Sequence, residues 1–496
     1  MASRPLAVAI AVTALITAAR LTGTVDSDVA WQLWTASRIH AGARLYRDII
    51  EVNPPLWFWM ALPVDSFATF FHARAEAVLT LAMGGITALS LAALNPLLTN
   101  LRRGSRTLML SCAALILMAM PWVHLGQREQ IVMIGTLPYA ALIAARHQGK
   151  GVPALLAASI GIGAALGFAL KHYFLIVPLL LELWLLARQG REWRWRRPEI
   201  LAILGVGALY ACAILVWARA YFTEIVPLVQ QTYGMLKPPG LRFLFGAYAL
   251  VGLSALTLAA AHMRSVARRE LPITSALLVT ATGFAAVYFI QAKGWIYHAI
   301  PLVGCSSFAL AALLAESAKP MRMLRLAAPA LLAFPLFLSA TELRYPALPT
   351  PDLEASVSGL HPGDTVGFLA VETAVPWSIT LQHGLQYPSR YMGYWMLNAI
   401  VSDEHREHPD ARLARLGRQI IADTVTDFRC TPPKRIVVAR PRPGEPGFDI
   451  LHFFLRDPQF AELLSHYRVR SRTSFETFEL VSPWPRVARS QCTIGA

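Results

Sequence analysis

The sequence predicts a polytopic helical membrane protein that carries a smaller α/β domain at its carboxyl end. The chain has 496 residues, of which 55% are hydrophobic and only 15% are charged, and its mean hydropathy is +0.46. A soluble protein of this length could not easily bury so much apolar surface. Apolar runs approaching the span length of about 20 residues recur up to residue 341 and are absent from 342–496. We therefore expect a transmembrane core, 1–341, and a soluble α/β domain, 342–496.

Eleven apolar runs are the expected membrane spans. The first, residues 5–21, follows Arg4. A cleaved signal peptide has a similar pattern, but we favour an uncleaved span because the chain keeps returning to the membrane. The remaining ten runs are 75–98, 107–121, 130–145, 152–170, 173–187, 199–218, 242–262, 272–290, 299–316 and 326–341. Together they predict a mainly α-helical bundle of about eleven spans.

The positive charge of the chain follows the loops between these runs. A formal charge of +15 could indicate nucleic-acid binding, but Lys and Arg between apolar runs set membrane topology instead. With the amino terminus inside, the inner loops 99–106, 146–151, 188–198, 263–271 and 317–325 carry 16 Lys or Arg residues, and the outer connections 122–129, 171–172, 219–241 and 291–298 carry five. This bias places the loop 23–74 and the residues after 340 on the outer face, and we expect no nucleic-acid partner.

The outer loop after the first span begins with a short helix. Residues 29–41 are helix-like and carry Trp31 and Trp34 three positions apart, which is typical of a helix lying along the membrane surface. Gly42 ends this helix. Asn53-Pro54-Pro55 then breaks the backbone before the apolar stretch 56–63, which we expect to help form a groove for a lipid chain.

The tail has the mixed pattern of a small α/β domain. Its strand-like runs are 365–371, 435–439 and 474–481, and its helix-like runs are 412–421 and 457–467. No catalytic motif is visible within it.

Two of the five cysteines lie in this tail. Cys430 and Cys492 could form a disulfide if the tail is extracytoplasmic, or stay reduced if it is not. Cys112, Cys212 and Cys305 lie inside apolar runs and are expected to be small core residues.

Four acidic residues gather directly after the first span. Asp26, Asp28, Asp48 and Glu51 lie within 26 residues of each other. One interpretation is an ordinary polar loop with an aspartate capping a helix. The other is a reactive carboxylate, because acids directly after a span are unexpected unless a cationic or reactive group approaches them.

Polar residues also mark the outer ends of the later spans, where they are often functional. Together with Asp26 and Asp28 they form four groups: His124, Gln127, Arg128 and Glu129; Lys171 and His172; and Gln291, Lys293, Trp295, Tyr297 and His298. Each cation could instead reach a lipid headgroup, and each histidine could be a satisfied interface residue. An acidic pair that faces several basic groups suits a reaction in which a hydroxyl is deprotonated while an anion departs.

At these residues the chain resembles the GT-C glycosyltransferases, multispanning enzymes that use lipid-phosphate-linked sugars. The class includes the protein O-mannosyltransferases and the transferase that adds aminoarabinose to lipid A. The residues that carry the resemblance are Asp28, Arg38, Gly42, Tyr46, Asp48, Glu51, Pro54, Pro55 and Leu56. Two departures stand out: Asn53 replaces the lysine that many relatives have before Pro-Pro, and Ser27 separates the two acids.

The resemblance implies an inverting transfer of sugar from a polyprenyl-phosphate donor to an acceptor hydroxyl. Asp28 would be the general base, with Asp26 beside it. Donor phosphate would be bound by Lys171, His172, Lys293, His298 and Arg128, and substrate by Glu51, Tyr46, Glu129, Trp295 and Tyr297. The acceptor would be an envelope glycan, a lipid or a protein. The resemblance also implies a bacterial inner membrane with the active site and the tail in the periplasm.

Two further questions stay open on sequence alone. Asp26, Asp28, Glu129 and His124 offer ligands for a divalent cation, although we expect no obligatory metal. The main alternative function is a flippase or transporter of lipid-linked saccharide, for which Glu182 is the one clearly mid-span ionisable residue; a third is a scaffold with a ligand-binding outer domain.

Overall fold

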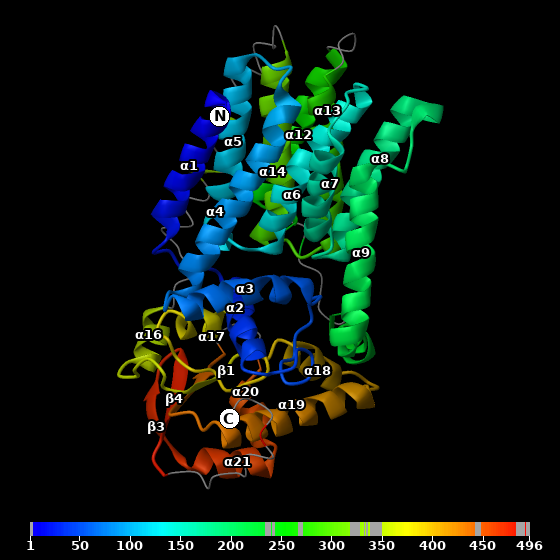
Figure 1. Cartoon of the computed structure of the whole chain (residues 1–496). Coiled ribbons are helices and arrows are strands. Elements are labelled where there is room, and N and C mark those ends of the chain that lie inside the picture. Colours follow the sequence, from blue (N-terminus) through cyan, green and yellow to red (C-terminus); the bar gives the residue numbers. More distant parts are fainter. Residues whose placement is uncertain are drawn as a thin grey trace. The chain divides into compact units, whose positions relative to one another are not determined.

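The computed structural model describes residues 3–233, 240, 244–265, 271–317, 328–331, 333, 336–337, 350–441, 448–482 and 492. The chain is mainly helical and forms two compact units (Figure 1). Unit 1 comprises Met1–Val25, Ser66–Ala213 and Pro238–Pro346, and unit 2 comprises Asp26–Asp65, Ile214–Lys237 and Ala347–Ala496. The acidic segment after the first helix therefore folds with the tail. The boundary at 341/342 between a membrane domain and an outer domain stays a prediction.

Ten of the eleven predicted apolar runs are confirmed as helices. They are α1 (Arg4–Arg20), α4 (Ala75–Leu94), α5 (Arg103–Met118), α6 (Arg128–His147), α7 (Ala154–Phe168), α8 (Ile176–Gln189), α9 (Pro198–Trp217), α12 (Ala247–Ser265), α13 (Pro272–Gln291) and α14 (Ile296–Glu316). The run 326–341 lies mostly outside the described residues.

Five helical segments in the described part of the chain are long and apolar enough to cross a membrane. They are Ala75–Leu98, His172–Glu192, Pro198–Trp217, Pro272–Gln291 and Ile296–Glu316. The protein is thus a multi-pass integral membrane protein, and the count of eleven spans stays a prediction.

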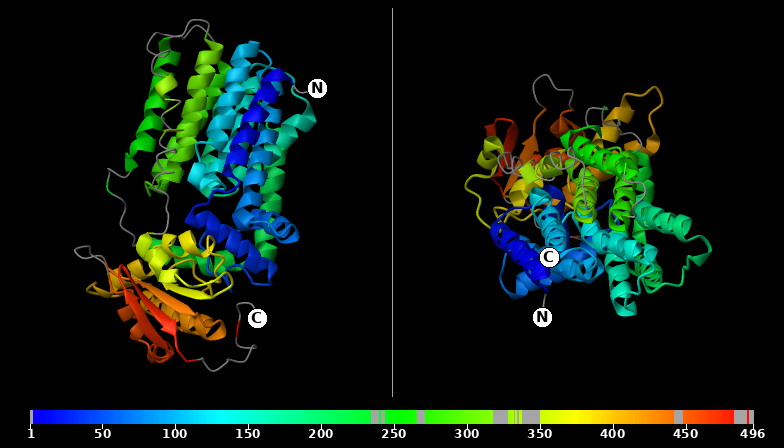
Figure 2. Two further views of the ribbon diagram at one scale, coloured as in Figure 1. Left: turned by 90° about the vertical axis from the view of Figure 1, so that its left-hand side faces the viewer. Right: turned by 90° about the horizontal axis from the view of Figure 1, so that it is seen from above.

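Helix α14 is the central helix of unit 1. It is buried along most of its length and packs against α5, α6, α12 and α13 (Figure 2). Small residues allow close approach elsewhere in the bundle. A Cβ atom at Gly135 of α6 would lie 2.5 Å from the carbonyl oxygen of Gly163 on α7, and one at Gly167 would lie 2.8 Å from the Cα of Val132. These glycines therefore set the spacing of α6 and α7.

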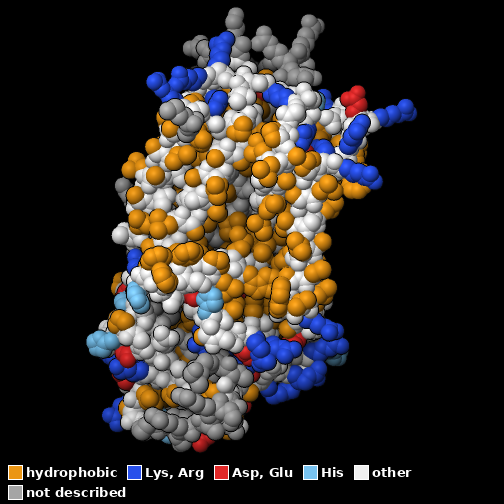
Figure 3. Space-filling view, viewed as in Figure 1, with side chains coloured by type: hydrophobic (Ala, Val, Ile, Leu, Met, Phe, Trp, Pro, Cys, Tyr) orange, Lys and Arg blue, Asp and Glu red, His pale blue; other side chains and the backbone are white. Residues whose placement is uncertain are grey.

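One end of unit 1 is basic. Arg106 joins the starts of α1 and α5 to the end of α4, since its guanidinium donates to Asn95 Oδ1 at 2.6 Å and to Ser3 Oγ at 2.9 Å. Arg146 at the end of α6 donates to Glu199 at the start of α9 at 2.9 Å. In Figure 3, Lys and Arg side chains gather at this end of the helices, whereas hydrophobic side chains cover their flanks. The predicted inner loops 99–106, 146–151 and 188–198 thus share one end of the bundle.

Unit 2 is built on a four-stranded mixed sheet of order β1-β2-β4-β3. Its strands are β1 (Val366–Leu369), β2 (Arg435–Ala439), β3 (Tyr467–Arg472) and β4 (Phe475–Leu480). β1 and β2 are parallel, and the other pairs are antiparallel. The three predicted strands are confirmed. The predicted helix 457–467 is too long, because α21 (Pro458–Ser465) ends before β3 begins.

Helix α19 (Ala411–Cys430) follows β1 and precedes β2. Its Phe428 ring packs against the sheet so closely that a Cβ at Gly367 of β1 would lie 2.5 Å from it. The remaining elements of unit 2 are α2 (Ser27–His40), the start of α3 (Leu56–Phe70), a π-helical turn (Tyr221–Ile225), α10 (Val226–Tyr233), α16 (Pro351–Val357), α17 (Ala374–Thr380), α18 (Leu397–Glu404) and α20 (Ile450–Leu455).

The tryptophans of α2 belong to an aromatic core of unit 2. Trp31 stacks on Trp34 with ring centroids 4.8 Å apart, and Trp377 of α17 lies 5.0 Å from Trp31 and 5.4 Å from Trp34. Tyr387 lies 5.0 Å from Trp377. Placing Trp31 at a membrane surface was wrong, because its side chain is only 1% exposed and packs against the tail.

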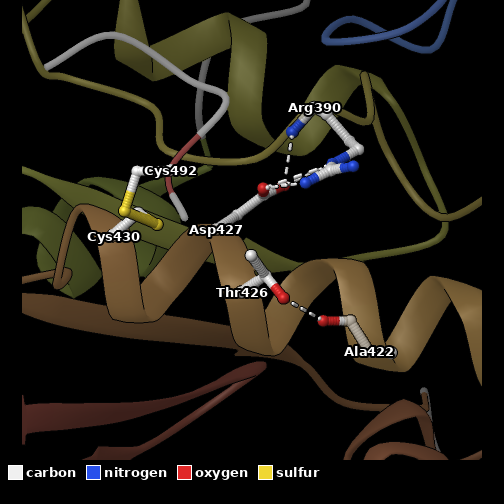
Figure 4. Close-up of a disulfide and its surroundings, with 6 residues drawn as sticks. All are labelled: Arg390, Ala422, Thr426, Asp427, Cys430 and Cys492. Carbon is white, nitrogen blue, oxygen red and sulfur yellow. Dashed lines mark hydrogen bonds and ion pairs between the residues drawn. A yellow bond between two sulfur atoms is a disulfide. The ribbon is translucent and has the colours of Figure 1, made fainter. Parts of the chain in front are cut away.

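The disulfide that the sequence left open is present. Cys430, the last residue of α19, is bonded to Cys492, and the two are 62 residues apart in the chain (Figure 4). Cys112, Cys212 and Cys305 are free. Cys305 is buried in α14, as expected, whereas Cys212 is exposed on α9, so the core assignment was wrong for Cys212.

Candidate functional site

The opposite end of unit 1 holds a buried polar cluster. It consists of Glu129 in the first turn of α6, Lys171 after α7, Gln291 at the end of α13 and His298 in the first turn of α14. The Lys171 Nζ lies 2.5 Å from Glu129 Oε1, 3.0 Å from Gln291 Oε1 and 3.2 Å from His298 Nε2. We call these four residues the Lys171 cluster. Three groups that the sequence predicted at outer span ends are therefore in direct contact.

Burial makes the Lys171 cluster an unusual environment for charge. Glu129 is fully buried, and Lys171, Gln291 and His298 are each less than a tenth exposed. An ammonium has three N–H donors, and these three contacts can use them all. The carboxylate neutralises the ammonium, which is the condition under which a buried pair is tolerated.

Two atoms of the Lys171 cluster have acceptor or donor capacity left over. Among the described residues, neither Glu129 Oε2 nor His298 Nδ1 has a hydrogen-bond partner, although both are buried. Buried polar atoms are normally satisfied by protein, water or ligand. The cluster therefore has a carboxylate oxygen and an imidazole nitrogen suited to a bound hydroxyl.

Aromatic rings adjoin the Lys171 cluster. The Tyr297 ring lies 5.8 Å from the Lys171 ammonium and 4.6 Å from the His298 ring. His124 lies 5.6 Å from Tyr297, and Trp295 lies 5.7 Å from it, half-exposed at the edge. Tyr and Trp combine a large apolar ring with a polar O–H or N–H group, which suits contact with sugars and lipids.

The other predicted cations of unit 1 lie around this end in different settings. Arg128 begins α6 beside Glu129 and is 3% exposed. Lys293 lies in the connection between α13 and α14, where burial lowers the pKa of its ammonium. His172 is exposed and packs on Tyr173 with a 3.8 Å ring separation. The structure thus groups Lys171 with His298, and places His172 on the surface.

The two predicted catalytic acids have different local roles in unit 2. Asp26 is the N-cap of α2 and accepts a 2.9 Å hydrogen bond from the Val29 backbone N–H. The helix-cap interpretation therefore holds for Asp26. Asp28 lies in the first turn of the same helix and is half-buried. A carboxylate there is stabilised by the positive end of the helix dipole.

The segment 44–53 holds the remaining acids in a defined loop. Arg44 donates to Asp48 through its backbone N–H at 2.8 Å and its Nε at 2.9 Å. Burial would raise the pKa of the Asp48 carboxyl, but these hydrogen bonds and the Arg44 charge hold it below its usual range. Glu51 accepts from the Trp31 indole N–H and from the Asn53 backbone and side chain, both at 2.7 Å.

The tail residues that support this segment were not predicted from the sequence. Ile50 donates its backbone N–H to the Arg390 carbonyl at 2.8 Å. Arg390 in turn binds Asp427 of α19, with its Nη2 at 2.7 Å from Oδ1. The one available signal was a pair of aspartates, Asp423 and Asp427, four residues apart on the otherwise apolar face of a strongly amphipathic helix.

Glu182, which a transporter would use, has protein partners. It accepts from Tyr139 Oη at 2.9 Å, from Trp193 Nε1 at 3.0 Å and from Arg197. It therefore tethers the loop after α8. Within the described ranges, no group of three or more His, Cys, Asp or Glu side chains could hold a metal ion.

Comparisons with known proteins agree at the level of fold. No family model matches the chain, and no curated protein matches it in sequence. The crystal structure of ArnT from Cupriavidus metallidurans bound to undecaprenyl phosphate is similar with a TM-score of 0.55 at 13% identity, covering 96% of this chain and 97% of that one. The apo form gives a TM-score of 0.54 at 14% identity, covering 95% and 96%.

A weaker match is the oligosaccharyltransferase AglB from Archaeoglobus fulgidus in complex with an inhibitory peptide and a dolichol-phosphate. Its TM-score is 0.41 at 11% identity, covering 87% of this chain and 69% of that one. The likeness to ArnT confirms, for the fold, the resemblance that the motif after the first span predicted. This chain therefore has an ArnT-like fold over nearly its whole length.

Proposed function

We propose that the protein is a membrane glycosyltransferase that moves a sugar from a polyprenyl-phosphate donor to an acceptor hydroxyl. The observation that carries this proposal is the ArnT-like fold over 96% of the chain, because that ArnT was crystallised with undecaprenyl phosphate. The acidic motif after α1 supports it independently, since it was identified from sequence alone. The donor would enter along apolar helices such as α3 and the spans that flank the Lys171 cluster.

In this proposal Asp28 is the general base. It takes the proton of the acceptor hydroxyl as that oxygen attacks the anomeric carbon from the side opposite the phosphate, which inverts the configuration. Phosphate is already a good leaving group, so a second carboxyl acid of the glycosidase type is not required. Asp26 serves beside it by capping α2 and so fixing the direction of the Asp28 carboxylate.

The departing phosphate needs positive charge and hydrogen-bond donors around it. Arg128, Lys293 and the exposed His172 would contact it, whereas Lys171 would act mainly by holding Glu129 and His298. The remaining substrate contacts would come from Trp295, Tyr297, Glu129, Tyr46 and Glu51. Glu129 Oε2 and His298 Nδ1 are the atoms that would bind a sugar hydroxyl.

Arg20, at the end of α1, stacks its guanidinium 5.0 Å over Trp122, at the end of unit 1 that carries the Lys171 cluster. We propose that this end faces the periplasm of a bacterial inner membrane, that the bundle has about eleven spans, and that residues 342–496 form the outer domain, which would select a glycan, lipid or protein acceptor.

The test is transfer by the purified full-length chain. It is incubated with a panel of polyprenyl-phosphate sugars, and release of the lipid phosphate is measured. Asp28→Asn should lower turnover by about 10²–10⁴-fold, the usual contribution of a general base. Asp364→Asn is the matched control, because Asp364 is an acid of unit 2 near the surface, where it accepts from the His361 backbone N–H at 2.8 Å and pairs with Lys434 at 3.0 Å.

Two outcomes would contradict the proposal. Normal turnover by a folded Asp28→Asn variant would remove Asp28 from its role. No lipid phosphate release by wild type from any donor of the panel, with detergent-stable protein and several acceptors present, would remove the transferase assignment itself.

A further inference from the structure

Residues 44–53 adopt a conformation that needs outside support. Tyr46 is fully buried and has φ +72°, in the left-handed region that costs a side-chain-bearing residue about 1–3 kcal/mol. Two contacts close the turn internally: the Tyr46 N–H donates to the Ile49 carbonyl at 2.8 Å, and the Tyr46 hydroxyl donates to the Asn53 carbonyl at 2.7 Å. Such a turn persists only when the surrounding structure fixes it.

Hydrogen bonds from other parts of unit 2 hold this segment. The Trp31 indole binds the Glu51 carboxylate, and the Arg390 carbonyl accepts the Ile50 N–H at 2.8 Å. Ile50 pairs with Tyr391 as an isolated parallel bridge, so the tail adds one strand-like contact beside Glu51. The position of Glu51 therefore depends on the position of residue 390.

Arg390 is itself held by hydrogen bonds from both its backbone and its side chain. Its backbone N–H donates to Asp427 Oδ2 at 2.9 Å, and its Nη2 donates to Oδ1 at 2.7 Å (Figure 4). Its Nη1 lies 3.3 Å from Asp423, and Tyr391 donates its hydroxyl to Asp423 at 2.7 Å. Because one carboxylate binds both the backbone and the guanidinium, Asp427 determines where the Arg390 carbonyl points.

This ion pair is buried. The Asp427 side chain is 1% exposed, and the Arg390 side chain is 13% exposed. Burial raises the pKa of the Asp427 carboxyl to about 6 against the opposing hydrogen bonds of Arg390, so the group is ionised at neutral pH. A buried pair is weak evidence for stabilisation, but its directional hydrogen bonds can specify one conformation.

We propose that Arg390 and Asp427 are positioning residues that hold the segment 44–53, and with it Glu51, in a single conformation. The consequence for activity rests on the function proposed above, in which Glu51 contacts substrate. Neither Arg390 nor Asp427 needs to touch substrate. Cys430 lies three residues after Asp427, so the disulfide anchors the same end of α19 (Figure 4).

Hydrogen exchange on the full-length protein in detergent tests whether Arg390 and Asp427 hold the segment 44–53 in one conformation. In Asp427→Asn, the carboxylate that fixes residue 390 is lost, and amide exchange at Ile50 should accelerate by about tenfold or more while β2 stays protected. Arg390→Lys keeps the charge and the backbone bonds but loses the planar fork, so its acceleration should be smaller. Asp364→Asn, which breaks a surface pair in the same unit, should leave Ile50 unchanged.

Steady-state kinetics test the consequence of this positioning for activity. A displaced substrate-binding Glu51 should raise KM by about tenfold with kcat little changed, because it removes binding common to ground and transition states. A purely structural role would lower the active fraction, and hence the apparent kcat, at constant KM.

The outcomes separate this inference from the proposed function. Unchanged exchange at 44–53 in Asp427→Asn, or an equal rise there and in β2, would overturn the positioning role. If Asp427→Asn does not fold, the Arg390→Lys variant tests the positioning role by the same comparison of amide exchange at Ile50 and in β2. If wild type transfers no sugar but amide exchange at Ile50 still accelerates in Asp427→Asn, the proposed function fails and the positioning role of Asp427 stands.

Discussion

Loss of the disulfide between Cys430 and Cys492 should destabilise unit 2 by an amount that its loop length predicts. The bond closes a loop of 62 residues. In the chain-entropy account, a cross-link over that length removes about 4 kcal/mol of conformational freedom from the unfolded chain. For a unit of this size, that corresponds to a fall in Tm of about 10 °C. Cys430→Ser is the perturbation.

The assay must follow unit 2 rather than the whole chain, because a protein with two units need not unfold in one step. Hydrogen exchange of the β1 and β2 amides during a temperature series reports on that unit. Cys212→Ser is the matched control, because Cys212 is a free, exposed thiol on α9. Cys212→Ser should leave the unfolding temperature of unit 2 unchanged.

Thiol counting gives an independent check. Unfolded wild type without reductant should expose three reactive thiols, Cys112, Cys212 and Cys305, and two more after reduction. If the disulfide is intact in wild type and unit 2 nevertheless unfolds at the same temperature in wild type and in Cys430→Ser, the loop-entropy reasoning is refuted. Five thiols before reduction in protein from the native membrane would refute the bond, and with it the oxidising compartment that such bonds require.

Two further predictions follow from buried charge and a third from helix packing. Lys171→Met should lower the free energy of unfolding by about 3–5 kcal/mol, because it leaves Glu129 charged and buried; a thermal melt checks it, and Lys171→Met with Glu129→Leu should recover most of the loss. Since the pKa of Asp427 rises on folding from 3.8 to about 6, the folded state holds that proton more firmly, and stability should fall as pH rises from about 4 to about 6. Asp427→Asn should abolish that component, and melts across this pH range would show it. Gly167→Leu should prevent α7 from packing on α6 and lower the yield of folded protein, because even a Cβ would meet Val132.

Much of the helical part of the fold could be predicted because its signal is local. Hydropathy alone found α1, α13 and α14, and their ends differ from the predicted runs by only a few residues. β3 was missed because its sequence, Tyr-Arg-Val-Arg-Ser-Arg, offers too few apolar residues to stand out. Arg468 and Arg472 lie exposed on this edge strand, where such charges discourage pairing with other chains.

The support of the candidate site could not be predicted, because it is not local. Ile50 and Arg390 are 340 residues apart in the chain, and Arg390 lies in no motif that the sequence shows. Trp31 illustrates the same limit: from sequence it resembled a membrane-interface residue, yet Trp377 buries it within unit 2. Periodicity reports which face of an element is apolar, but not which distant segment covers that face.

The Lys171 cluster also changes how the charges of the candidate site should be counted. From sequence, Arg128, Lys171 and Lys293 were three independent cations for a phosphate. In the structure Glu129 neutralises Lys171 at 2.5 Å, so Lys171 is not an independent cation for a phosphate. Removing Glu129 alone would leave the Lys171 ammonium buried without its carboxylate. Glu129→Gln should therefore lower the free energy of unfolding of unit 1, which a thermal melt would show, rather than supply the phosphate with one more cation.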